Sequence, residues 1–182
     1  CFRQHFTMRG FITLLSVIVT IMMTIQDVQG QGDTCNQGSV CPLNFFYNPA
    51  LGSCYNFVIS EKISWYDALS VCAGMDANLV AIETQEELDF LRNEIKGRGI
   101  VGNGDRNGNS FHVGGNMLFG TWQWMGGPSR KTKPISFAPW RPNEPNNLNV
   151  QKCVVLYGGD DFLFHNWECQ IKFYYICEIK ID

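Results

Sequence analysis

The sequence predicts an α+β fold in which two helices lie beside small antiparallel sheets and a long loop region. Two segments before residue 97 carry apolar residues at helical spacing, and no helix signal follows them. The rest consists of short strand-like runs divided by glycine, asparagine and proline. With 182 residues, 45% of them hydrophobic, the chain can bury one substantial core.

The amino-terminal 40 residues are expected to lie outside this fold. Residues 1–7 read as an upstream remnant, and residues 8–30 have the basic start, apolar run and small-residue end of a signal peptide. The apolar run, residues 11–25, is shorter than the roughly 20 residues of a membrane span. We therefore expect a secreted, extracellular protein with a short segment at 31–40 and one domain at 41–180; a retained signal anchor is the alternative.

Seven cysteines remain once Cys1 is set aside, and in an oxidising compartment they are disulfide candidates before they are metal ligands. Sequence alone cannot fix their pairing, but the spacing proposes one. Cys41 and Cys54 flank a turn-rich stretch between aromatic runs, and Cys153 and Cys169 bracket two strand-like runs joined by a glycine pair. The pairs proposed are Cys41–Cys54, Cys153–Cys169 and Cys72–Cys177, with Cys35 left over.

Two helices are expected between residues 63 and 97. The first, in "ISWYDALSVCAGM", has Trp65, Ala68, Leu69 and Cys72 on one face. The second, in "ETQEELDFLRNEIKGRG", opens with a capping box of Thr84 and Glu87. Its apolar stripe is Leu88, Leu91 and Ile95, and the Glu86–Glu87 pair is read as lying on a solvated face.

Beyond residue 97 the pattern changes. Residues 97–110 form a glycine- and asparagine-rich loop, followed by the strand-like "FHVGG" and "TWQWMGG". A proline-rich loop then runs through residue 149 to three closing strands. Within it, "WRPNEPNN" gathers a carboxylate and three amides around two prolines, which suits either a metal ion that prefers oxygen ligands or a plain solvated loop.

Taken together, these segments resemble a C-type lectin domain from about Cys41 to Lys180. The motifs that carry the likeness are "CPLNFFYNPALGSCYNF", "SWYDALSVCAGMDANLVAIETQEELDFL", "FHVGG", "GTWQWMGG", "FAPWRPNEPNN", "CVVLYGG" and "YYICE". The resemblance supports the three proposed disulfides and implies the long form of the domain, with an amino-terminal hairpin. It also implies that the Glu144-Pro145-Asn146 triplet supplies calcium ligands across a cis proline bond.

The resemblance implies a calcium site that also contacts sugar, but with altered ligands. Gln151 stands where the family has Glu, and Phe164-His165-Asn166 replaces Trp-Asn-Asp. The charge at the five positions falls from -3 to -1, so we expect weak Ca²⁺ binding. Asp160 and Asp161 could replace a carboxylate or form a solvated turn, the favoured interpretation. The expected metal ligands are Glu144, Asn146, Gln151, His165 and Asn166, and the first four of these are the expected carbohydrate contacts.

The aromatic residues divide into packing and contact roles. Trp122, Trp124 and Trp140 are expected to pack in the core, as is His112. Trp167, beside the altered triplet, could stack on a sugar face or be buried.

The favoured function is a secreted, calcium-dependent lectin for mannose, N-acetylglucosamine or fucose, with a role in innate immune recognition. Its glycans would carry equatorial 3- and 4-hydroxyls, and Cys35 could link a homodimer through an intermolecular disulfide. The alternative is a calcium-independent module that binds protein, mineral or another surface. No nucleophile motif is readable, so no enzyme activity is expected, and the formal charge of -3 without a basic stripe predicts no nucleic-acid partner.

Overall fold

The computed structural model describes residues 40–100, 109–125 and 132–181. These ranges all belong to one compact unit, Gly38–Asp182. The predicted signal peptide and Cys35 therefore lie outside the described residues. Among the helices in the described ranges, none is long and apolar enough to cross a membrane.

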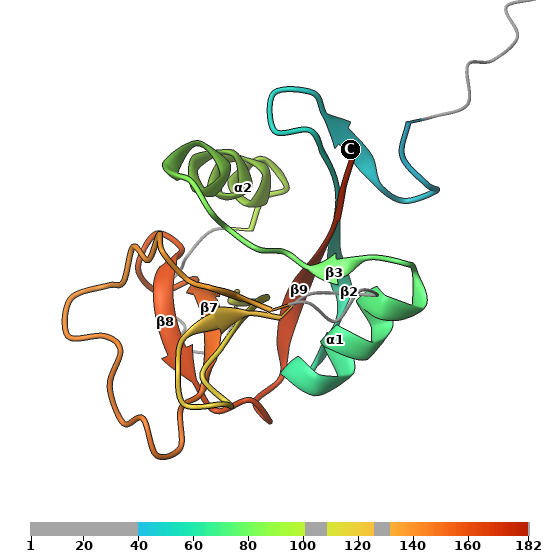
Figure 1. The fold of residues 1–182 in the computed structure, drawn as a ribbon. Coiled ribbons are helices and arrows are strands. Elements are labelled where there is room, and N and C mark those ends of the chain that lie inside the picture. Colours follow the sequence, from blue (N-terminus) through green and yellow to red (C-terminus); the bar gives the residue numbers. More distant parts are fainter. Residues whose placement is uncertain (1–39, 101–108, 126–131, 182) are drawn as a thin grey trace, which may run out of the picture. The chain divides into compact units, whose positions relative to one another are not determined.

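The described residues form an α+β fold with two helices and a connected set of short strands (Figure 1). In chain order the elements are β1 (Phe46–Asn48), β2 (Ser53–Ile63), α1 (Trp65–Gly74), β3 (Asn78–Leu79), α2 (Gln85–Gly97), β4 (Phe111–Asn116), β5 (Gln123–Trp124), β6 (Lys133–Pro134), β7 (Cys153–Tyr157), β8 (Leu163–Trp167) and β9 (Phe173–Lys180).

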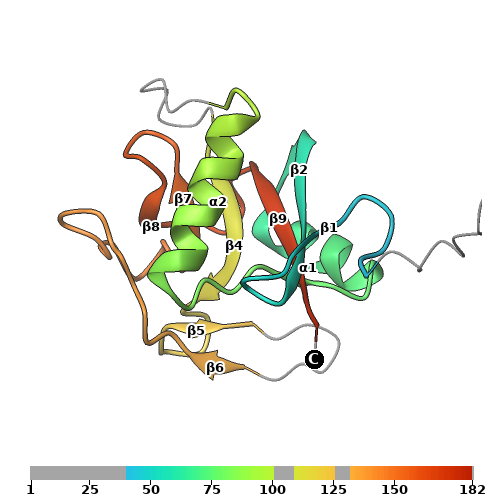
Figure 2. The same cartoon turned by 90° about the horizontal axis from the view of Figure 1, so that it is seen from above.

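The strand order is β1-β2-β9-β4-β5-β6; β3 pairs with β9, and β7 pairs with both β4 and β8. The pairings are antiparallel, as predicted, except that β4 runs parallel to β9. The last strand, β9, therefore lies between β2 and β4 and pairs with both. In both views β9 separates the two helices (Figures 1 and 2).

Both helices begin where the sequence predicts. Ser64 caps α1 by accepting from the Asp67 amide at 3.2 Å, and Thr84 caps α2 by accepting from the Glu87 amide at 3.1 Å. In α1 the buried residues are Trp65, Ala68 and Cys72; in α2 the predicted stripe of Leu88, Leu91 and Ile95 is buried, and so is Glu87.

The interpretation of Glu87 as solvated is wrong. The residue is 2% exposed, while its neighbour Glu86 is exposed as expected. Its carboxylate turns inward, where Oε1 accepts from the Tyr55 hydroxyl at 2.7 Å and Oε2 from the Glu83 amide at 3.0 Å. These partners satisfy a charge that helical spacing alone places at the surface.

The three proposed disulfides are all present: Cys41–Cys54, Cys72–Cys177 and Cys153–Cys169. The first closes the β1–β2 hairpin, the second joins α1 to β9, and the third joins the start of β7 to the residues after β8. All six cysteines pack in one of two buried clusters. The disulfides therefore tie the start of the described fold to β2, and α1 to the central strand β9.

His112 and Trp124 lie in the core as predicted, 0% and 2% exposed. Burial lowers the pKa of His112 to about 4. The backbone carbonyls of Ile171 and Ile63 favour the charged ring and oppose this shift, but burial is the larger effect. Trp122 and Trp140 are only partly buried, with ring centroids 5.0 Å apart, and pack against the larger cluster.

Candidate functional site

The candidate site lies where the long loop between β6 and β7 meets β8 (Figure 1). The start of the loop is fixed to β8 by two backbone bonds: Arg141 donates to the Phe164 carbonyl at 2.9 Å, and Phe164 donates to the Pro139 carbonyl at 3.0 Å. The loop then turns sharply through the cis Glu144–Pro145 bond that the resemblance implies. This path places Glu144 and Asn146 opposite β8.

Asn166 of β8 holds the loop in place through its side-chain amide. Oδ1 accepts from the Asn146 amide at 3.0 Å, and Nδ2 donates to the carbonyls of Asn146 at 2.5 Å and Gln151 at 2.8 Å. Asn166 is 0% exposed, so its side chain supplies the hydrogen bonds that water would otherwise make to the backbone of both loop segments. Its oxygen keeps a second lone pair, and its role as a metal ligand stays a prediction.

His165, the residue before it, contacts Glu144. Nε2 of the imidazole lies 3.0 Å from Glu144 Oε1, and the two side chains are only 8% and 4% exposed. The other ring nitrogen, Nδ1, lies 2.6 Å from the Asn166 carbonyl oxygen. The structure thus brings together all five predicted site residues, with Asn146 and Gln151 joined to Asn166 through their backbones.

The electrostatic environment of His165 is mixed. Burial lowers its pKa below the ordinary value and the charge of Arg141 lowers it further, while the Asn166 carbonyl and the Glu144 carboxylate oppose that shift. The lowered pKa favours a neutral ring at pH 7. The Asn166 carbonyl and the Glu144 carboxylate both only accept, so a neutral ring donates to one of them and a protonated ring donates to both.

A comparison with known proteins places this fold and loop in a family. Residues 61–179 match the family model described as Lectin C-type domain. The chain belongs to the C-type lectin domain family.

Relatives and solved structures agree with that assignment. Human C-type lectin domain family 4 member E is 32% identical over 145 residues, which cover 76% of this chain and 58% of the relative's length. Human lithostathine superposes with a TM-score of 0.63 at 25% identity, over 85% of this chain and 99% of its own. A calcium-independent type II antifreeze protein, at 19% identity, covers 77% of this chain and 94% of its own with a TM-score of 0.60, a likeness of fold alone.

C-type lectin domains commonly bind Ca²⁺ at this loop, and the donors present here fit a divalent cation. Glu144 Oε2 and Gln151 Oε1 are both buried without a hydrogen-bond partner among the described residues. An orphaned buried oxygen is costly unless a ligand completes it. Within the described ranges no three His, Cys, Asp or Glu side chains converge, so amide oxygens must contribute to such a site.

Arg141 adjoins the site and was not singled out from the sequence. Its Nη1 lies 4.0 Å from Glu144 Oε1, while its Nε donates to Asp160 Oδ2 at 3.0 Å. The sequence feature that could have indicated Arg141 as a neighbour of the site is its position three residues before Glu144 in the same turn. Its positive charge opposes cation binding and so strengthens the expectation of weak affinity.

Neither aspartate of the β7–β8 turn supplies a second carboxylate beside Glu144, because both form ion pairs with other residues. Asp160 is paired with Arg141, and Asp161 forms ion pairs with Arg92 and Lys96 of α2, the second at 2.5 Å. These contacts tie the turn to α2 and to the start of the long loop. Trp167 is partly buried, with its ring stacked on Tyr157 at 5.8 Å and 4.7 Å from the His165 ring.

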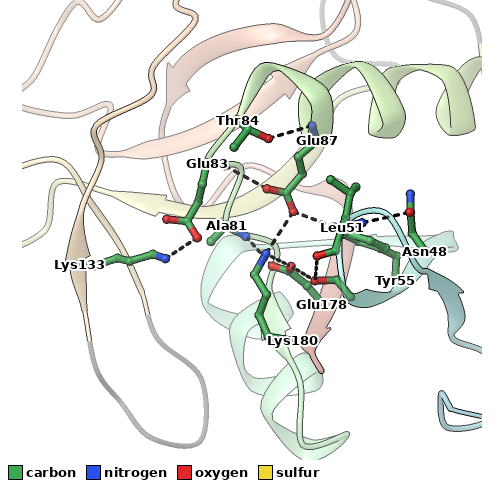
Figure 3. A network of polar contacts seen from close by, with 11 residues as sticks. Asn48, Leu51, Tyr55, Ala81, Glu83, Thr84, Glu87, Lys133, Glu178 and Lys180 are labelled. Carbon is green, nitrogen blue, oxygen red and sulfur yellow. Dashed lines mark hydrogen bonds and ion pairs between the residues drawn. The ribbon is translucent and has the colours of Figure 1, made fainter. Parts of the chain in front are cut away.

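A second polar cluster, around Glu87 and Glu178, was also missed (Figure 3). Glu178 of β9 accepts from Ser53 at 2.8 Å and pairs with Lys180 at 2.7 Å. Burial and then the charge of Glu178 raise the pKa of Glu87. A cavity of about 380 Å³ adjoins the cluster, lined by Asn78, Ala81, Glu83, Trp124, Met125, Thr132, Lys133, Glu178 and Lys180.

Proposed function

We propose that the chain is a secreted, non-catalytic lectin that binds carbohydrate through a weakly held Ca²⁺ ion. The observation that carries this proposal is that two buried oxygens, Glu144 Oε2 and Gln151 Oε1, have no hydrogen-bond partner among the residues that the structure describes, in the loop where the family holds its cation. The preferred sugars would be of mannose type, with equatorial 3- and 4-hydroxyls. The ion would be held by Glu144, Asn146, Gln151, His165 and Asn166, and the first four of these would contact the sugar.

Weak calcium binding follows from charge. Ca²⁺ takes about six to eight oxygen ligands, and its affinity rises with the number of carboxylates among them. Glu144 is the only carboxylate among the five predicted ligand positions, and the cation Arg141 lies 4.0 Å from it. We therefore expect occupancy at the millimolar calcium of the extracellular space, the upper part of the range for such modules.

The deciding experiment is calorimetric titration of Ca²⁺ into the full chain, with and without mannose. The chain is compared with a double variant, Glu144→Gln with Asn146→Ala, and with Asn149→Ala, an exposed position of the same loop. Calcium uptake that mannose strengthens, lost in the double variant and kept in Asn149→Ala, supports the lectin. Mannose binding that is unchanged without calcium contradicts it.

The second candidate is a calcium-independent module that binds protein, mineral or another surface. The contact between His165 and Glu144 favours it, because an N–H of the imidazole that donates to the carboxylate would occupy that carboxylate without any metal. No calcium uptake at several millimolar, with the chain folded, would select this candidate.

Secretion and dimerisation complete the proposal. Cleavage near Gly30 or Gly32 would release the chain, which mass spectrometry of the protein in the medium would detect. Cys35 would then link two copies, so that Cys35→Ser abolishes a reducible dimer on a non-reducing gel. Two linked sites raise the avidity for a multivalent glycan without any new contact.

A further inference from the structure

We infer that the cavity of about 380 Å³ beside β3 and β9 binds a small zwitterion with an apolar side chain, such as a free aromatic α-amino acid. Its lining comes from β3, β5, β6, β9 and the segment between β3 and α2. Among the described residues that line it, none is a predicted calcium ligand. The site is therefore separate from the proposed lectin site and needs no calcium.

The cavity has the size and the apolar wall of a small-molecule site. Ligand pockets in proteins have volumes of about 300 to 1,000 Å³, a range that includes this one. Ala81, Trp124 and Met125 supply apolar surface. The Trp124 ring belongs to the larger buried cluster and packs edge-on against Phe164, so its position is fixed. An apolar ligand side chain, an aromatic ring above all, finds its contacts on this wall.

Charged groups of both signs line the same cavity (Figure 3). Lys133 forms an ion pair with Glu83, and Lys180 pairs with Glu178 at 2.7 Å, so two positive and two negative charges face the ligand. A simple anion or cation would meet a charge of its own sign beside each partner. A zwitterion instead places its carboxylate near the lysines and its ammonium near the glutamates, which makes it the best electrostatic match.

Both lysines have N–H groups to offer a ligand carboxylate. Their side chains are 52% and 45% exposed, and each ammonium carries three donors. The ion pair with Glu83 occupies one donor of Lys133, while Glu178 and Glu87 occupy two of Lys180. A carboxylate can therefore accept from either ammonium without breaking an ion pair.

An unsatisfied acceptor indicates where the ligand ammonium lies. Asn78 lines the cavity, and its Oδ1 is buried without a hydrogen-bond partner among the described residues. Such an oxygen is costly unless a donor completes it. Asn78 lies directly opposite Glu178 in the β3–β9 pairing, so the two side chains are neighbours on one face. Glu178 Oε2 accepts from the Ala81 amide at 3.2 Å and keeps a second lone pair, so one ammonium can donate to both residues.

The test is a titration of L-phenylalanine into the isotopically labelled full chain, followed by NMR at pH 7.4 with EDTA present. Two analogues separate the charges: phenethylamine lacks the carboxylate, and 3-phenylpropionic acid lacks the ammonium. We expect phenylalanine to bind with a dissociation constant of about a millimolar, as suits a ligand of this size. Each analogue should bind at least about fivefold more weakly, and the shifted backbone signals should belong to residues that line the cavity.

Two variants assign the ends of the ligand. Lys133→Met, at an exposed position, should weaken phenylalanine about threefold to fivefold and leave phenethylamine unchanged, because that amine has no carboxylate to lose. Asn78→Ala should weaken phenylalanine and phenethylamine alike and leave 3-phenylpropionic acid unchanged. Lys172→Met, at an exposed lysine outside the cavity lining, is the matched control and should change none of the three.

The absence of any shift among the cavity residues at about 20 mM phenylalanine would overturn the inference. Equal binding of phenylalanine and phenethylamine would overturn it too, as would equal losses in Lys133→Met and Lys172→Met. Circular dichroism checks that each variant is folded; should Asn78→Ala fail to fold, Lys133→Met decides. Because EDTA removes calcium throughout, none of these results bears on the lectin proposal, which the calcium titration tests separately.

Discussion

The side-chain amide of Asn166 binds both backbone groups of Asn146. Its Oδ1 accepts from the Asn146 N–H at 3.0 Å, and its Nδ2 donates to the Asn146 carbonyl at 2.5 Å. A third bond, to the Gln151 carbonyl, joins the end of the loop to the same side chain. One buried amide therefore sets the position of both loop segments that carry the proposed cation ligands.

Replacing Asn166 by alanine should destabilise the fold more than its small loss of volume suggests. Three backbone groups would lose their partner in a buried place, and we expect a loss of about 2 to 3 kcal/mol in the free energy of unfolding. Urea denaturation at pH 7 measures it. Asn149→Ala, in an exposed part of the loop, should change stability by less than about 0.5 kcal/mol; equal effects of the two variants would contradict the proposed role of Asn166.

Acid should destabilise the fold through His112. Its pKa in the folded state is about 4, below the ordinary value of about 6.5, so the unfolded chain binds the proton more readily. The stabilisation is complete above pH 6.5 and is lost as the pH falls toward 4. The pKa difference corresponds to on the order of 3 kcal/mol.

Denaturation curves between pH 7 and 4 test this assignment to His112. His112→Gln cannot titrate and keeps an N–H group for the Ile171 carbonyl, so its stability should vary less with pH than that of the unaltered chain. His165→Asn should retain most of the acid sensitivity. A pH dependence that persists unchanged in His112→Gln would assign the effect to another group.

Lys180 should stabilise the fold by neutralising two buried carboxylates. Its ammonium lies 2.7 Å from Glu178 Oε1 and 3.6 Å from Glu87 Oε1, and both glutamates are 2% exposed (Figure 3). Lys180→Met leaves those charges uncompensated, and we expect a loss of about 2 kcal/mol, moderated because the lysine itself is half exposed.

A double-mutant cycle separates this coupling from general damage. Glu178→Gln removes one of the charges, so the combined variant should lose less stability than the sum of the two single changes. Thermal or urea unfolding of the four proteins at pH 7 provides the numbers. Simple additivity would mean that Lys180 does not stabilise the fold through Glu178.

Local features were predictable from the sequence because they depend on neighbours in the chain. The helix caps at Ser64 and Thr84 and the apolar stripe of α2 follow from residue type and spacing. The disulfides follow from cysteine spacing, turn residues and an oxidising compartment. The loop motif also placed Glu144 and Asn146 at one site, beside His165.

Contacts that depend on distant partners were not predictable in this way. Glu87 looks like a surface cap until Tyr55, 32 residues away, donates to it. The parallel pairing of β4 with β9 and the bond from Asn166 to Asn146 likewise join residues that no periodic pattern connects. These contacts decide which polar side chains of the site are satisfied and which remain for a ligand.

Opening the disulfide with the widest spacing should cost the most stability. Cys72 and Cys177 are 105 residues apart in the chain, whereas Cys41 and Cys54 are only 13 apart. In the chain-entropy account, a crosslink restricts the unfolded chain more as its loop grows, which predicts losses of about 5 and about 3 kcal/mol for the two pairs. Cys72 also joins α1 to the central strand β9, so its loss should loosen both.

Paired alanine variants at each bridge, compared by guanidinium denaturation under non-reducing conditions, measure the difference. Removing Cys41–Cys54 should leave a folded chain with a lower unfolding midpoint. Removing Cys72–Cys177 should lower it further or prevent folding at 37 °C. The reverse order would mean that packing around the hairpin, rather than loop entropy, determines what each bridge contributes.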